Sequence, residues 1–157
     1  MPTMAPEHAN LADTLRALTD DELARLVTAR PDLVTPLPSD IDQLAARSTT
    51  RSSLARVLDR LDRFVLAVVE GLVVSPTPAS VESLRDLLGV DAARLAAAIG
   101  ELRTLALVWG PDDALEVPAV LPEFLGPHPA GLGPPADDRA LADPRQVAKL
   151  LADAGPE

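Results

Sequence analysis

The chain contains no cysteine and no tyrosine, and Lys149 is its single lysine. Without cysteine, disulfides, zinc fingers and thiol catalysis are excluded. The aromatic residues Phe64, Trp109 and Phe124 make up 2% of the sequence, which is too little for a surface that stacks single-stranded bases. The core must therefore be built from leucine, valine, isoleucine and alanine, a composition that suits helices.

The sequence also lacks positive charge, because its formal net charge is −10 at pH 7. Non-specific DNA affinity comes mainly from lysine and arginine side chains that neutralise phosphates, so any DNA contact is expected to be weak. No apolar run approaches the length of a transmembrane helix, and the first residues lack the basic and apolar regions of a signal peptide. We expect a cytoplasmic protein without membrane contact.

Residues that carry catalysis are missing as well. The histidines His8 and His128 lie in proline-flanked segments, and neither has a serine or carboxylate at a spacing typical of a catalytic pair. Paired aspartates begin at Asp20, Asp112 and Asp137, at a helix cap, a turn tip and a tail. No glycine-rich phosphate loop is present. We therefore expect no catalytic residue, no metal site, no cofactor and no enzymatic activity.

The apolar fraction of 47% indicates a folded protein, and 157 residues suffice for one domain with a small appendage. The sequence divides into a disordered lead-in at 1–9, an N-terminal helical unit at 10–60, a winged-helix domain at 61–125, and a Pro/Gly-rich linker with a weakly helical tail at 126–157. The fold class that we expect is mainly α.

The stretch from Leu61 to Val117 carries the winged-helix prediction. Its pattern is helix, helix, helix and a two-stranded wing, which is the order of a winged helix-turn-helix. The predicted helices are 62–74, 77–89 and 91–103. The predicted wing strands are 106–109 and 114–117, joined by the turn 110–113.

Whether the helix before this motif continues into it is open from the sequence. Leucine and valine recur at heptad-like spacing from Leu54 to Leu72, which allows one long helix over 51–73. A break near Leu61, with Asp62 as the N-cap of a separate helix, fits equally well. We favour two helices, because a winged-helix fold needs a first helix of three to four turns.

The third helix of the motif does not resemble a DNA-reading helix. Its predicted outward positions are mostly alanine and glycine, and its basic residues are Arg94 and Arg103. DNA-reading helices normally present arginine, lysine, asparagine or glutamine to base edges. Asp112 and Asp113 at the wing tip would repel phosphates. A small, flat face suits contact with another protein surface.

The candidate contact residues are arginines that precede and enter the motif. They are Arg47, Arg51, Arg56, Arg60 and Arg63. In one interpretation they form a stripe that contacts phosphates or docks on a partner. In the other they belong to a solvated helix face on which Asp59 pairs with Arg56 and Arg63. Trp109 has two interpretations of its own, core packing at the base of the wing or an anchor for a partner.

Four segments together resemble the N-terminal region of actinobacterial helicase-associated proteins related to the XPB/Ssl2 helicase. The segments are Leu23 to Leu33, Leu58 to Leu72, Leu102 to Gly110 and Gly126 to Pro135. The resemblance implies an accessory part of a larger DNA-processing protein. This chain has no Walker A motif and no motor domain, and the resemblance assigns it no catalytic residue.

The function expected from these features is a non-catalytic accessory module that docks on another protein or on a downstream domain. Phosphate contacts through the arginine stripe would be secondary. The alternative is a winged-helix transcription regulator, whose duplex binding would depend on Arg94 and Arg103.

Overall fold

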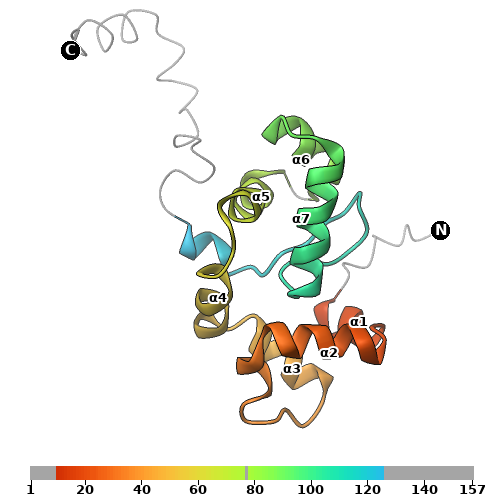
Figure 1. The fold of residues 1–157 in the computed structure, drawn as a ribbon, viewed down its shortest axis with the longest axis vertical. Coiled ribbons are helices and arrows are strands. Elements are labelled where there is room, and N and C mark those ends of the chain that lie inside the picture. Colours follow the sequence, from red (N-terminus) through yellow and green to blue (C-terminus); the bar gives the residue numbers. More distant parts are fainter. Residues whose placement is uncertain (1–9, 77, 126–157) are drawn as a thin grey trace, which may run out of the picture.

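The computed structural model describes residues 10–76 and 78–125. The predicted lead-in at 1–9 and the linker and tail at 126–157 lie outside the described residues. Within them the fold is mainly helical, as expected. Figure 1 shows α1, α2 and α3 at one end of the molecule, α5, α6 and α7 at the other, and α4 between them. The elements are α1 (Leu11–Arg16), α2 (Asp20–Ala29), the 3-10 helix η1 (Pro31–Val34), α3 (Ile41–Ser48), α4 (Arg51–Leu58), α5 (Arg63–Val74), α6 (Val81–Leu88), α7 (Ala92–Thr104) and the 3-10 helix η2 (Leu121–Phe124).

The sequence Thr19-Asp-Asp-Glu22 predicts a capping box, and the structure forms it. The amide of Glu22 donates to the Thr19 hydroxyl at 3.3 Å, and the amide of Thr19 donates to the Glu22 carboxylate at 2.8 Å. This reciprocal capping box fixes the start of α2. The helix ends at Ala29, just before Arg30 and Pro31, as the proline predicts.

The helix is interrupted between α4 and α5, so the prediction of two separate helices is confirmed. The Asp62 carboxylate accepts the backbone amides of Phe64 at 2.8 Å and Val65 at 2.9 Å. These bonds satisfy two of the amides that a helix start leaves unpaired. Asp62 therefore begins α5 as an N-cap, and the turn before it separates the two helices.

The second and third helices of the motif lie close to where the sequence placed them. α6 begins later than Thr77, because Ser80 is its N-cap and Ala79 takes part in a backbone bridge. Gly89 ends α6 with φ +61°, the left-handed conformation that glycine adopts without strain. Asp91 then caps α7 by accepting the amide of Arg94 at 3.0 Å.

The predicted two-stranded wing is not formed. Residues 106–117 contain no strand, and the segment is held by isolated antiparallel bridges between Trp109 and Glu116 and between Ala79 and Leu115. Ala106, where the chain leaves α7, has φ +53°, a left-handed conformation that is strained for a side chain with a Cβ. The hairpin is reduced to one bridge, in which Trp109 and Glu116 exchange two backbone hydrogen bonds.

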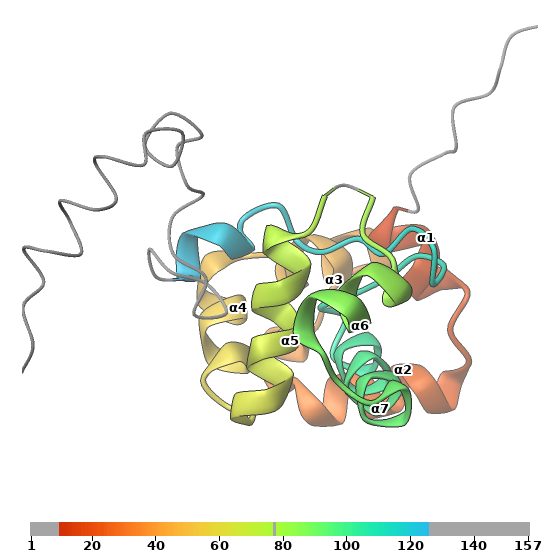
Figure 2. The same ribbon diagram turned by 90° about the horizontal axis from the view of Figure 1, so that it is seen from above.

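The core consists of two clusters of buried side chains. The larger one joins α4, α5, α6 and α7 with Leu121 of η2. α4, which the sequence analysis grouped with the N-terminal unit, thus packs on the second half of the molecule. The smaller cluster joins α1, α2 and α3 with Ala106 and Trp109 from the segment after α7. In Figure 2, seen from above, α7 lies beside α2, and the two helices are in contact.

Candidate functional site

Three of the five arginines in the expected stripe contact the chain itself. Arg47 of α3 donates to the carbonyls of Leu33, at 3.3 Å, and of Pro36. It thereby holds the connector between α2 and α3. Arg51 of α4 forms an ion pair with Glu123 of η2, and its side chain is 70% exposed.

The remaining members of the stripe lie around the turn between α4 and α5. Arg60 donates to the Ala29 carbonyl at 3.4 Å. Arg56 and Arg63 are exposed and form no hydrogen bond or ion pair with another described residue. The pairs expected between Asp59 and these two arginines are also missing from the described ranges, since α4 ends at Leu58 and Asp59 is not followed by continuous helix.

Both arginines of α7 face neighbouring elements. The Arg94 guanidinium lies over the Phe64 ring, 3.9 Å from its centroid, which is cation–π geometry. Arg103 donates to the Gly110 carbonyl at 2.8 Å and to the Asp112 carboxylate at 2.9 Å. The acidic turn is therefore tied back to α7, and the two arginines that a DNA-reading helix would use are already engaged.

Trp109 lies in the core. Its residue is 8% exposed and belongs to the cluster built by α1, α2 and α3. The indole therefore joins the N-terminal unit to the second half of the chain. This placement favours the core-packing interpretation over that of an anchor for an external partner.

Alanine and glycine make up most of the exposed positions of α7. The exposed residues of this helix are Ala92, Ala93, Arg94, Ala96, Ala97, Gly100, Glu101, Arg103 and Thr104. A Cβ built on Gly100 would have no heavy atom within 4 Å, so the space outside this glycine is open. Leu95, Ile99 and Leu102 are buried, as expected from their spacing.

Arg30 is the important residue that the sequence analysis did not single out. It is 1% exposed and donates to the carbonyls of Leu105 and Ser48, both at 2.8 Å, and to the Ser53 hydroxyl at 2.7 Å. Burial lowers the pKa of this guanidinium and the Asp32 charge raises it. Arg30 thus connects the ends of α2, α3 and α7 with α4. Its only sequence signal was an arginine at the C-cap of α2.

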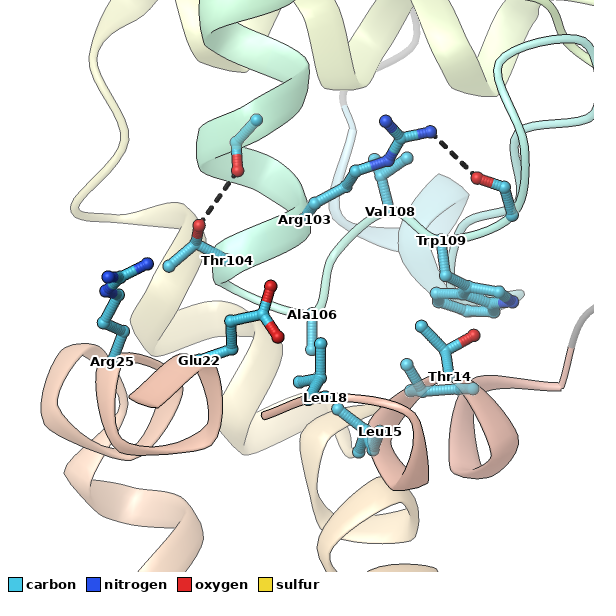
Figure 3. Close-up of a pocket in the computed structure, with 13 residues that line it drawn as sticks. Thr14, Leu15, Leu18, Glu22, Arg25, Arg103, Thr104, Ala106, Val108 and Trp109 are labelled. Carbon is cyan, nitrogen blue, oxygen red and sulfur yellow. Dashed lines mark hydrogen bonds between the residues drawn. The ribbon is translucent and has the colours of Figure 1, made fainter. Parts of the chain in front are cut away.

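A pocket of about 330 Å³ opens between the N-terminal helices and the C-terminal end of α7. Leu15, Leu18, Ala106, Val108 and Trp109 form its apolar lining. Figure 3 shows the Trp109 ring above Thr14 on one side and Glu22 and Arg25 rising from α2 on the other. Gly100 lies on its α7 wall, so the pocket adjoins the small outer face of that helix.

The charged side chains that line this pocket differ in whether they already form hydrogen bonds within the chain. The amide and hydroxyl of Thr19 donate to Glu22, and these bonds, with the nearby Arg25 charge, hold the pKa of the Glu22 carboxyl below its ordinary value. The Arg103 guanidinium is bound to the turn. Arg25 forms no hydrogen bond or ion pair within the described part of the chain.

Across residues 10–76 and 78–125, no group of three or more His, Asp or Glu side chains is placed to hold a metal ion. Among the same residues, no helix combines the length and apolarity needed to cross a bilayer. Comparison of the chain with protein-family models, with curated proteins and with solved structures found no match.

Proposed function

We propose that this chain is a non-catalytic accessory module that docks on a protein surface, as part of a helicase-associated DNA-processing protein. Its architecture would be a winged helix whose wing is reduced to single bridges. The helix order and the bridges of Ala79 and Trp109 support this architecture, because they stand where a winged helix carries its three short strands. The DNA-processing context rests on the resemblance described above.

The observation that carries the docking function is the contrast between the arginines and the outer face of α7. Five of the seven candidate arginines contact the chain itself, through carbonyls, carboxylates or a ring. The face that would enter a DNA groove instead offers alanine and glycine next to a pocket with an apolar lining. Small side chains allow a second protein surface to approach closely, whereas phosphates require mobile positive charge.

The alternative, a DNA-binding regulator, draws support from Arg56 and Arg63 alone. Both are exposed and unpaired within the described residues, and they flank the turn before α5. Two such charges would give weak, salt-sensitive contact without base readout.

The docking function is tested by measuring whether the outer face of α7 is covered in cells. Because the chain has no cysteine, a maleimide labels only an introduced thiol. The probe variant is Ala97→Cys, on the outer face of α7, and the matched control is Ala24→Cys, at an exposed position of α2. Both thiols are expected to react at equal rates in the purified chain.

In cells of the source organism, the proposal predicts that labelling at position 97 slows at least about tenfold while labelling at position 24 does not change, since a docked surface excludes the reagent. Equal rates at the two positions in cells would contradict docking through this face.

A further inference from the structure

The pocket at the end of α7 has the composition of a receptor for one side chain. Its apolar lining comes from both halves of the molecule, with Leu15 and Leu18 on the α1 side and Val108 and Trp109 from the segment after α7. A volume of about 330 Å³ lies at the small end of the range found for binding pockets. It fits one large aliphatic side chain together with its flanking backbone.

Gly100 lines this pocket on its α7 side. Nothing lies within 4 Å of a Cβ built there, although the neighbouring helix positions carry side chains. Any side chain at position 100 would occupy that open space beside the pocket.

The charge at the rim indicates what should accompany the aliphatic group. Glu22 already accepts hydrogen bonds within the fold, and Arg103 already donates them. Arg25 differs, because its guanidinium makes no hydrogen bond or ion pair with any described residue. A guanidinium carries five N–H donors, and two of them can bind the two oxygens of one carboxylate. Arg25 is therefore suited to bind a carboxylate supplied by a ligand.

We propose that this pocket receives a large aliphatic side chain of a partner protein, whose adjacent carboxylate pairs with Arg25. The inference rests on the proposed docking function and specifies the partner at that site, a segment in which leucine or isoleucine stands next to glutamate or aspartate.

Three capped dipeptides test this chemistry on the full chain: N-acetyl-Leu-Glu-amide, N-acetyl-Leu-Lys-amide and N-acetyl-Ala-Glu-amide. Trp109 is the only tryptophan and lines the pocket, so its fluorescence reports binding. Trp109 also lines a second, more open groove that includes Ala46. Backbone amide shifts in NMR spectra distinguish the two, because only the proposed pocket moves Gly100 and Thr104.

The Leu-Glu peptide is expected to bind saturably at millimolar concentration, about tenfold more tightly than the other two, as one charge-assisted contact implies. Arg25→Glu should reverse the preference, so that the Leu-Lys peptide binds best. Gly100→Leu should abolish binding while leaving the fold intact by circular dichroism, and Gly100→Ala is its small control.

Two results overturn the inference: equal binding of the Leu-Glu and Leu-Lys peptides, or no saturable shift at Gly100 and Thr104 with any peptide. Either result leaves the docking function standing if position 97 is still protected in cells. If position 97 is not protected in cells but the Leu-Glu peptide still binds, the docking function fails. The pocket would then bind peptides without docking through α7.

Discussion

Replacing Arg30 with methionine should destabilise the chain more than changing any exposed arginine. The guanidinium is buried and donates to two backbone carbonyls and one hydroxyl. Methionine fills much of the same volume but donates nothing. The Leu105 and Ser48 carbonyls would lose a buried donor, and Asp32 would lose its nearby cation.

The size of this effect follows from the groups left without partners. A buried acceptor that loses its hydrogen bond costs about 1–3 kcal/mol, so two carbonyls alone account for about 2–6 kcal/mol. The Nε atom of Arg30 has no partner among the described residues, so part of the wild-type burial is already unfavourable. We therefore expect a loss of about 3–5 kcal/mol, the range measured when one partner of a buried ionic group is removed.

Urea unfolding followed by Trp109 fluorescence and by circular dichroism measures this loss. Arg56→Met is the matched control, since Arg56 is exposed and its replacement should change the unfolding free energy by less than about 0.5 kcal/mol. An Arg30→Met protein within about 1 kcal/mol of wild type would refute the argument, because the buried acceptors would then have found other donors.

Further predictions concern single positions whose environments are defined. Gly100→Ala should stabilise the chain by about 1 kcal/mol in thermal or urea unfolding, because alanine is the better helix former and the added Cβ meets nothing. Gly110→Ala should destabilise it by more than about 1 kcal/mol, since its φ is +87° and the added Cβ would lie 2.4 Å from the Ala114 carbonyl oxygen; equal melting temperatures for these two variants would contradict both assignments. Trp109→Ala should cost about 3–5 kcal/mol by urea unfolding monitored with circular dichroism, and a near-neutral result would mean that the indole is not part of the core. The pKa of Glu22 is lowered by the Thr19 hydrogen bonds, so its contribution is complete above the ordinary glutamate pKa and is lost as pH falls through the lower, folded value. Melting temperature measured against pH should therefore fall less steeply on the acid side in Glu22→Gln than in wild type, and parallel curves would show that the capping box does not contribute.

The sequence predicted those features whose cause is local. The caps at Thr19, Asp62 and Asp91 and the glycine that ends α6 follow from residues within four positions of one another. The buried face of α7 follows from helical spacing in the same way. Leu87 is an exception, since its helical spacing predicts an inward position but it is 44% exposed.

Features that depend on distant segments were not predictable in this way. The partners of Arg30 lie 18, 23 and 75 residues away in the chain, so no local pattern marks it as buried. The same holds for Arg51, whose ion-pair partner Glu123 is distant in the sequence. The sequence predicted two wing strands where the structure forms one bridge. Turn residues and alternating apolar positions indicate a hairpin, but they do not determine how many bridges it forms.

The most direct test of a docking module, as opposed to a DNA reader, is fluorescence anisotropy against duplex and single-stranded DNA at low and near-physiological salt. The wild type is compared with Arg56→Ala/Arg63→Ala, which removes the two arginines of the expected stripe that have no partner among the described residues. We predict no binding at near-physiological salt for either protein. Binding that persists there, weakens with added salt and disappears in the double variant would contradict the account and make the chain a nucleic-acid module.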